Sequence, residues 1–384
     1  MKKIIQSIFK PQEFMLQLCK KNWNGDRKFV QLALFGLQSN TYVVTDIGLA
    51  KQMLSEVYQP KKPSGCPFKR ATEMSKEVLR VLGTQSTLMT NDTRSHNEVR
   101  LLILKHFSEY QDSNFYEKIF NEVFDMEINR ENISPSAISL KYTARVILNI
   151  VFGENIVIDI ERASTCIEKI SEIGFMMNRL RFLKPILKYG YNKQSKEIKS
   201  LLTELIDQAE SDSFAVKMQA AGYNKEHIFS ELITLFAAGH ETSSSVITNA
   251  IFEMIQHPKA SPNQIKQEVL RYYPPTWILS REHISGSSGV DLPHGTYLIP
   301  VYALNRNTSV LNGEMFDPYR EKSDILSFGY GKYSSCSGAS LAHKEIDVFL
   351  NEFNKIKEKF SISTLPKQKF STVAKPVGGL IKKI

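Results

Sequence analysis

Apolar residues recur every three or four positions over most of the chain, which is the spacing of one face of an α-helix. This pattern predicts helices over residues 47–57, 70–82, 95–107, 114–128, 137–151, 224–256 and 261–272. The longest of them, 224–256, has about nine turns and could cross a whole domain. The last one, 261–272, opens with a capping-box pattern, Ser261 and Gln264, and two prolines follow its end.

Alternation of apolar and polar residues is confined to short stretches. The segments 28–36 (KFVQLALFG) and 41–46 (TYVVTD) predict two strands of a small sheet. Residues 295–304 are strand-like, the region 305–327 is irregular, and the C-terminal tail again has strand character. The sheet is therefore expected to be minor.

The segment 161–208 predicts several helices, broken near Pro185 and Gly190. Within it, 176–191 (MMNRLRFLKPILKYGY) is apolar and basic. That composition fits a lid against a membrane or an apolar substrate, and it equally fits an ordinary connection between helices. Since neither a linker nor an internal repeat is evident, residues 1–384 are predicted to form one domain, mainly α with a minor β-sheet.

Composition narrows the classes of function. The chain has 384 residues, 42% of them hydrophobic, and a formal net charge of +9. No apolar run approaches the roughly 18 residues of a membrane span. The basic start MKKIIQSIFKPQEF lacks a small-residue cleavage site and predicts an amphipathic surface segment. Without a long basic run, nucleic-acid binding is not expected; a basic patch for an acidic protein and a merely solvated basic surface both remain open.

The four cysteines predict neither a disulfide framework nor a zinc site. Cys19, Cys66, Cys166 and Cys336 lie far apart, with no CxxC pair and no histidine cluster. Such usage favours a reducing cytoplasm, and it leaves one thiol free for a special role. Cys336 is the candidate, because it stands in a glycine-rich loop just before a predicted helix, FGYGKYSSCSGASLA. Free N–H groups at a helix N-terminus stabilise a thiolate, and glycines allow the backbone to fold closely around the sulfur.

The long predicted helix carries a second candidate stretch, AGHET, which includes Gly239, Glu241 and Thr242. Glycine weakens a helix interior, and threonine can bond back to the carbonyl four residues earlier, so a kinked helix with a groove is one interpretation. An acid beside an alcohol could then relay protons to a buried site. The alternative is a close helix crossing at Gly239 with Glu241 in solvent.

Charged residues elsewhere offer a third pattern. Glu268 and Arg271, in EVLR, face each other at a spacing of three on a predicted helix. An exposed pair of small energetic value is the simplest interpretation. His96, Arg100 and Arg281 are cationic residues that could meet carboxylates.

In this order the motifs resemble the cytochrome P450 family, the haem-thiolate monooxygenases. The resemblance covers most of the chain: AGHET, EVLR followed by YYPP, LNRN, FDPYR and finally the cysteine loop. It implies the cytochrome P450 fold, with haem b held between the long central helix and the helix after Cys336, the thiolate ligand of the iron. Residues implied to bind the cofactor are His96, Arg100, Ala238, Gly239, Arg281, Phe328, Tyr333, Cys336 and Gly338. Glu268 and Arg271 are implied to be structural.

By the same resemblance, Glu241 and Thr242 deliver protons to oxygen bound at the iron, and the enzyme hydroxylates or otherwise oxidises an apolar substrate, as in secondary metabolism. Candidate substrate contacts are Leu235, Phe236, Thr276, Trp277 and Ile278. Electrons from NAD(P)H would arrive through a ferredoxin or flavodoxin with its reductase. The substrate would be free or carrier-bound, and the protein a cytoplasmic monomer without a membrane anchor. Two alternatives are a peroxide-driven or isomerising haem-thiolate enzyme and a non-catalytic haem-binding protein.

The sequence departs from the family pattern in three places. Phe328 and Cys336 are separated by one residue more than usual, and Ser334 replaces the basic residue expected two positions before the cysteine. Met315 occupies the place of the third member of the family's Glu-Arg-Arg network, for which Arg320 is the expected substitute. Tyr333 is expected to offer a hydroxyl to a haem propionate in place of the missing base.

Overall fold

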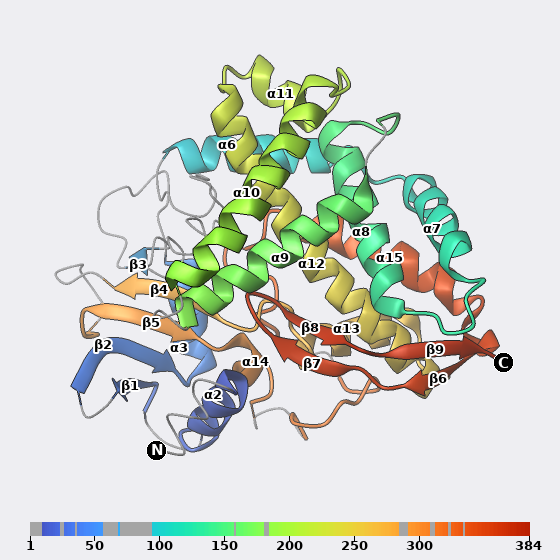
Figure 1. Ribbon diagram of the computed structural model, residues 1–384. Coiled ribbons are helices and arrows are strands. Elements are labelled where there is room, and N and C mark those ends of the chain that lie inside the picture. Colours follow the sequence, from blue (N-terminus) through green and yellow to red (C-terminus); the bar gives the residue numbers. More distant parts are fainter. Residues whose placement is uncertain are drawn as a thin grey trace.

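The computed structural model describes residues 10–23, 27–34, 37–56, 68–69, 94–156, 159–179, 184–283, 291–307, 312–321, 324–332 and 335–384 (Figure 1). The predicted helix over 70–82, the first residues of the basic N-terminal segment, Cys66, Tyr333 and Ser334 lie outside this part. Within it the chain is mostly helical, with one five-stranded sheet and two two-stranded sheets. The expectation of a mainly α fold with a minor sheet is confirmed.

The five-stranded sheet lies beside the helical part and joins strands from the first 69 residues to two strands from residues 279–299. Its strands, in the order β1-β2-β5-β4-β3, are Phe29–Leu34, Leu37–Val44, Gly295–Ile299, Leu279–His283 and Phe68–Lys69. β2 and β5 are parallel, and their register places Tyr42 opposite Tyr297, so the two rings stack with centroids 4.9 Å apart. Only the first half of the predicted 295–304 strand is β-structure, because the chain turns at Pro300 into the short helix α14, Val301–Leu304.

Around the sheet and along the helical core, most of the remaining helices follow the predicted apolar spacing. The N-terminal and early helices are α2 (Pro11–Lys20), α3 (Ile47–Ser55), α6 (Arg94–Phe107), α7 (Ser113–Glu127) and α8 (Pro135–Phe152). The later ones are α11 (Phe214–Ala220), α12 (Lys225–Gln256), α13 (Pro262–Tyr272) and α15 (Ala339–Asn354). α15 ends at Asn354, and a 3-10 turn, Lys357–Lys359, follows it. α11 was not predicted.

α12 runs through the middle of the helical part and packs against α8, α13 and α15 (Figure 1). Most of its residues are buried, because it has neighbours on several sides. Its first turn is capped by Asn224, whose Oδ1 accepts from the His227 N–H at 2.9 Å. The predicted capping box of α13 is confirmed, with both bonds between Ser261 and Gln264 present.

The segment 161–208 forms two long helices, α9 (Ile160–Arg179) and α10 (Lys184–Asp207), which pack against each other and cross α12 (Figure 1). The break lies before Pro185, which sits in the first turn of α10, where proline costs least. Gly190 lies inside α10 and does not interrupt it, so the predicted second break is wrong. No helix within the described ranges is long and apolar enough to cross a bilayer.

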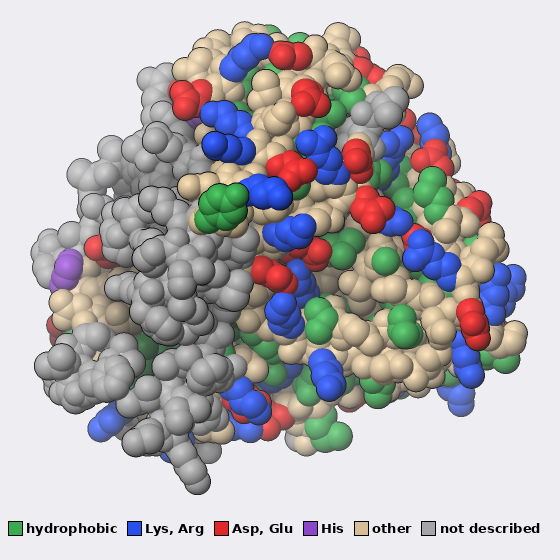
Figure 2. Space-filling view, viewed as in Figure 1, with side chains coloured by type: hydrophobic (Ala, Val, Ile, Leu, Met, Phe, Trp, Pro, Cys, Tyr) green, Lys and Arg blue, Asp and Glu red, His purple; other side chains and the backbone are tan. Residues whose placement is uncertain are grey.

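The C-terminal tail forms the expected strands, in two antiparallel pairs. β6 (Phe360–Thr364) pairs with β9 (Leu380–Lys383), and β7 (Lys367–Phe370) pairs with β8 (Ala374–Val377), which packs on α12. On the face shown in Figure 2, Lys and Arg side chains are interspersed with Asp and Glu. This mixture fits a solvated surface better than a continuous basic patch on that face.

Candidate functional site

A cavity of about 400 Å³ lies between α12 and α15 and is also bordered by α6 and the start of β4. This volume is typical of small-molecule and cofactor sites. The apolar side chains that line it come from elements far apart in the sequence: Phe107, Ile147, Leu235, Val246, Leu270, Leu279, Leu341 and Ile346. The polar groups on the walls include the thiol of Cys336 and three cationic residues.

α12 contributes one stripe of its surface to the cavity. Thr234, Leu235, Ala238, Gly239, Thr242, Ser243 and Val246 follow each other at helical spacing and all line the cavity. At Gly239, an added methyl group would meet Ile147 at 3.4 Å, which is ordinary contact. The crossing of α8 over α12 therefore does not require glycine here, and the missing side chain instead leaves room in the cavity wall. The Thr242 hydroxyl donates to the Ala238 carbonyl, and α12 continues unbroken through this turn.

Glu241 is next to Thr242 in sequence, but its side chain does not line the cavity. Lys375, from β8, places its Nζ 3.2 Å from Glu241 Oε1 and 3.0 Å from Glu168 Oε1 on α9. Burial acts to lower the pKa of Lys375, but the charges of Glu241 and Glu168 outweigh it and raise that pKa above its usual value. This ionic cluster therefore connects the central helix, the β7–β8 hairpin and α9, and the alternative of Glu241 in solvent is wrong.

His240 points in another direction, towards α8. Its ring stacks on Phe236 with centroids 5.3 Å apart, and its Nδ1 lies 3.2 Å from the Thr143 hydroxyl. Burial lowers the pKa of His240 to about 3, so the ring is neutral at physiological pH. Because Phe236 packs on this ring, it is turned away from the cavity, where a substrate contact had been expected.

The loop before α15 presents Cys336 to the cavity. Gly329 and Gly331 adopt positive φ angles of 74° and 90°, and a methyl group on Gly331 would lie 2.8 Å from the Ser55 backbone. The Cys336 N–H donates to the Phe328 carbonyl at 2.8 Å, which closes the loop. The side chain of Cys336 is exposed even though it lies deep in the protein, because its accessible surface belongs to the cavity.

The sulfur lies at the N-terminus of α15, as expected. α15 begins at Ala339 with Gly338 as its N-cap, and the Gly338 N–H bonds to the sulfur. Desolvation raises the pKa of the Cys336 thiol, while this N–H and the charge of Arg100 oppose the shift. A methyl group on Gly338 would meet the Phe107 ring at 3.8 Å and the Cys336 sulfur at 3.9 Å, which are ordinary contacts, so these neighbours do not require glycine here.

Three cationic residues line the same cavity: His96 and Arg100 from α6 and Arg281 from β4. All three are buried, at 4%, 9% and 7% exposure. Arg281 Nη1 donates to the Ser280 carbonyl at 2.8 Å, and Arg100 reaches the cysteine loop. A thiol that faces a cleft lined with apolar side chains, with buried cations on its walls, is the donor set that an iron porphyrin with two carboxylates requires. The residues present therefore fit haem.

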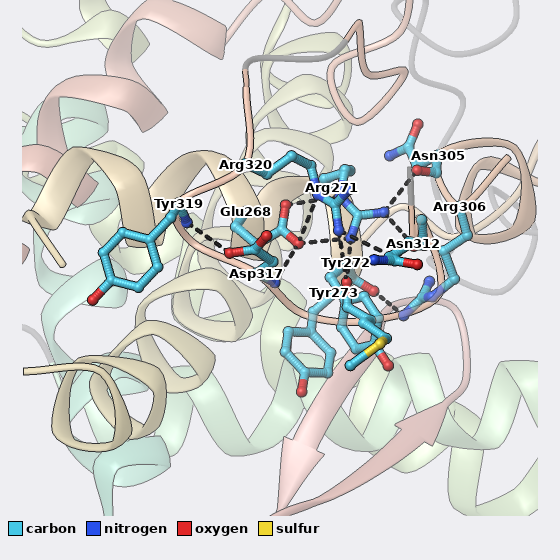
Figure 3. A network of polar contacts seen from close by, with 12 residues as sticks. Glu268, Arg271, Tyr272, Tyr273, Asn305, Arg306, Asn312, Asp317, Tyr319 and Arg320 are labelled. Atoms are coloured by element: carbon cyan, nitrogen blue, oxygen red, sulfur yellow. Dashed lines mark hydrogen bonds and ion pairs between the residues drawn. The ribbon is translucent and has the colours of Figure 1, made fainter. Parts of the chain in front are cut away.

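The pair in EVLR is buried and forms the centre of a network (Figure 3). Arg271 donates to both Glu268 oxygens, at 2.7 and 2.6 Å, and also to the carbonyls of Asn305, Gly313 and Met315. The Nε atom of Arg320 lies 3.4 Å from Glu268 Oε1. Arg320, which follows Met315 in the same segment, is thus the third charged member of the network. The network fixes α13 to the irregular segment that leads into the cysteine loop, and the interpretation of an exposed pair is wrong.

Of the expected substrate contacts, Leu235 and Thr276 line the cavity, whereas Phe236, Trp277 and Ile278 do not. Trp277 is buried beside β7, where its Nε1 donates to the Ser371 carbonyl at 2.9 Å. Leu279 takes the place on the cavity wall that had been expected of its neighbour Ile278.

A buried acid on α15 was missed from the sequence. Glu345 is 4% exposed, lines the cavity and accepts a hydrogen bond from Ser243 on α12. Burial raises the pKa of Glu345 to about 8, so its carboxyl is largely protonated at neutral pH. The sequence did contain a pattern that could have indicated this position. Gly338, Leu341, Ala342 and Glu345 are spaced so that they share one face of the helix that follows Cys336.

Comparison with known proteins finds that parts of this chain are similar to one family. A cytochrome P450 family profile matches residues 205–263. The biotin biosynthesis cytochrome P450 of Bacillus subtilis is 35% identical over 142 residues, and the 20-oxo-5-O-mycaminosyltylactone 23-monooxygenase of Streptomyces fradiae is 28% identical over 154 residues. These matches cover 33% and 36% of this chain, and the chain spans only about a third of the length of each of these relatives (35% and 36%).

Solved structures extend the likeness to the whole fold. CYP175A1 from Thermus thermophilus aligns with a TM-score of 0.77 at 19% identity, covering 99% of this chain and 96% of the other. P450BioI, solved in complex with an acyl carrier protein ligated to hexadec-9Z-enoic acid, aligns with a TM-score of 0.72 at 18% identity, covering 99% of this chain and 100% of the other. The arrangement of helices and sheets around the cavity is thus that of the cytochromes P450.

Proposed function

We propose that the chain is a member of the cytochrome P450 family, a haem-thiolate monooxygenase that oxidises an apolar organic substrate. The observation that carries the proposal is the position of Cys336, whose thiol opens into an apolar cavity that is also lined by Ala238, Gly239 and Thr242. In this proposal residues 1–384 form one domain, which acts in the cytoplasm as a monomer.

Cys336 would hold haem b through its sulfur, and His96, Arg100 and Arg281 would face the two carboxylates. When bound, the haem supplies the activation of O2 with two electrons, which come from NAD(P)H through a ferredoxin or flavodoxin and its reductase. The Gly338 N–H stabilises the thiolate form of Cys336, because it donates to the sulfur. The apolar walls exclude bulk water, which strengthens each of these contacts.

Thr242 would position water in the cavity and pass protons inward, since its hydroxyl lies on the wall. Glu241 would supply these protons from outside the cavity, where its carboxylate is paired with Lys375. Leu235, Thr276 and Leu279 would contact the substrate.

The substrate class follows from the apolar lining and from two relatives. Because one relative is named for biotin biosynthesis and one structural neighbour was solved with an acyl carrier protein, we propose a long acyl chain, free or bound to a carrier. A peroxide-driven reaction is the second candidate, because the Glu241 carboxylate does not line the cavity and proton delivery matters less when peroxide is the oxidant.

The test uses the haem-loaded protein with a ferredoxin, its reductase and NADPH. Candidate substrates are a free long-chain fatty acid, the same chain on an acyl carrier protein, and a terpenoid. We expect the Soret band to shift on binding of an acyl substrate and an oxygenated product to form only with the reductase system. Turnover with hydrogen peroxide but not with the reductase system would favour the second candidate, and no product under either condition would contradict an enzymatic function.

A further inference from the structure

The cysteine loop is one residue longer than the family pattern and lacks its basic residue. Arg100, on α6, reaches it from another part of the chain. Its Nη1 donates to the Ser335 carbonyl at 2.8 Å and to the Ser337 hydroxyl at 2.6 Å, and its Nη2 lies 3.5 Å from the Ser335 hydroxyl. One side chain thus contacts the residues on both sides of Cys336.

We propose that Arg100 is a positioning residue for Cys336, a clamp that fixes the extended loop and places a positive charge beside the sulfur. The inference rests on the proposed function, because it assigns Arg100 to the thiolate ligand in addition to a haem carboxylate. A guanidinium suits this task, since it offers five donors in a rigid plane and keeps its charge at any physiological pH.

Two features of the surroundings support the clamp. Arg100 is only 9% exposed, so its bonds to the loop are shielded from competing water. Two backbone bonds that shape the loop, from the Cys336 N–H to Phe328 and from the Ser335 N–H to Gly331, stay within the loop itself. The Arg100 bonds differ from these in joining the loop to α6, and the charge of Arg100 also acts on the sulfur.

The two serines provide a matched pair of variants around the same cysteine. Ser337→Ala removes the hydroxyl that accepts at 2.6 Å, whereas Ser335→Ala leaves the accepting carbonyl in place and removes only the contact at 3.5 Å. Ser337→Thr keeps a hydroxyl and serves as the conservative variant. Because Ser337→Ala removes a single hydroxyl, the comparison of the two serine variants does not depend on whether Arg100→Ala folds.

The measurements are the red-shifted Soret band of the reduced carbon monoxide complex and the rate of haem transfer to an apo-globin. One lost charge-assisted bond predicts about tenfold faster haem loss and a smaller red-shifted fraction for Ser337→Ala. We expect Ser335→Ala and Ser337→Thr to stay within about twofold of the parent. We expect Arg100→Ala to lose haem about a hundredfold faster, and the double variant Arg100→Ala/Ser337→Ala to be no worse than Arg100→Ala.

Two results would overturn the clamp alone: equal behaviour of Ser337→Ala and Ser335→Ala, or effects of Arg100→Ala and Ser337→Ala that multiply in the double variant. The second result would mean that Arg100 acts only on a haem carboxylate, independently of the loop. A parent protein that binds haem without showing the red-shifted band would contradict the proposed function, and the clamp with it.

Discussion

Replacing Lys375 by methionine removes the cation that Glu241 and Glu168 share, while it keeps most of the volume of the side chain. The two carboxylates differ in their access to water: Glu241 is 3% exposed and Glu168 is 32% exposed. Glu168 can therefore be hydrated once Lys375 is gone, whereas the Glu241 carboxylate stays inside the protein and loses the positive charge of Lys375. Most of the lost stability should come from Glu241.

Breaking a buried ion pair by removing one partner costs about 3–5 kcal/mol, and an exposed pair contributes about 0–1 kcal/mol. Because Lys375 is itself 12% exposed, we expect Lys375→Met to lower the free energy of unfolding by about 3 kcal/mol, the low end of that range. Lys369→Met is the matched control. Lys369 lies on the same hairpin and pairs with Glu172 of the same helix α9 at 2.6 Å, but these side chains are 48% and 38% exposed. Its loss should cost less than about 1 kcal/mol.

Urea unfolding of the haem-loaded variants measures both values, and the ratio of product formed to O2 consumed reports on proton delivery. We expect that ratio to fall in Lys375→Met and to stay at the parent value in Lys369→Met. Adding Glu241→Gln to Lys375→Met should recover much of the lost stability, because a neutral amide needs no cation. Equal losses in the two lysine variants, or no recovery with Glu241→Gln, would refute this account of the cluster.

Three further predictions concern other parts of the site. Thr242→Ala should increase the peroxide released per O2 consumed, because its hydroxyl lies on the cavity wall; a parent-like ratio would rule out a relay role. Glu268→Gln should lower the free energy of unfolding by about 3–5 kcal/mol, since buried Arg271 loses its counter-charge. Thermal unfolding measures this value, and a decrease of less than about 1 kcal/mol would contradict the prediction. The pKa of Glu345 is raised to about 8 from an ordinary value near 4.5, so the carboxyl keeps its proton to a higher pH in the folded state than in the unfolded state. Between pH 4.5 and 8 the free energy of unfolding should therefore fall as pH rises, by at most about 1.4 kcal/mol per pH unit. Glu345→Gln should flatten that slope, and parallel stability curves would refute it.

Local patterns in the sequence predicted the elements well where apolar spacing was regular. The predicted helix 224–256 begins one residue before α12 and ends with it, and α15 follows the cysteine loop as predicted. The break at Gly190 was wrong because a glycine within a long helix costs only about 1 kcal/mol, which packing of α10 against α9 offsets.

Side-chain direction within the site was harder to predict. Neighbours such as Leu235 and Phe236 point to different sides of α12, and the sequence gives no sign of which side the cavity occupies. The contact between Lys375 and Glu241 joins residues 134 positions apart, and only the folded chain brings them together. Arg100 was expected only at a haem carboxylate. Its contact with the cysteine loop could not be predicted, because it too joins residues far apart in the sequence.

The most direct test of the central claim, that Cys336 is the thiolate ligand of a haem, is the absorption spectrum of the reduced carbon monoxide complex of the parent and of single cysteine variants. We expect a red-shifted Soret band in the parent and in Cys166→Ser, since Cys166 is buried in α9 and does not line the cavity. Cys336→Ser should still take up haem but lose that band. Retention of the band in Cys336→Ser, or its loss in Cys166→Ser, would contradict the assignment.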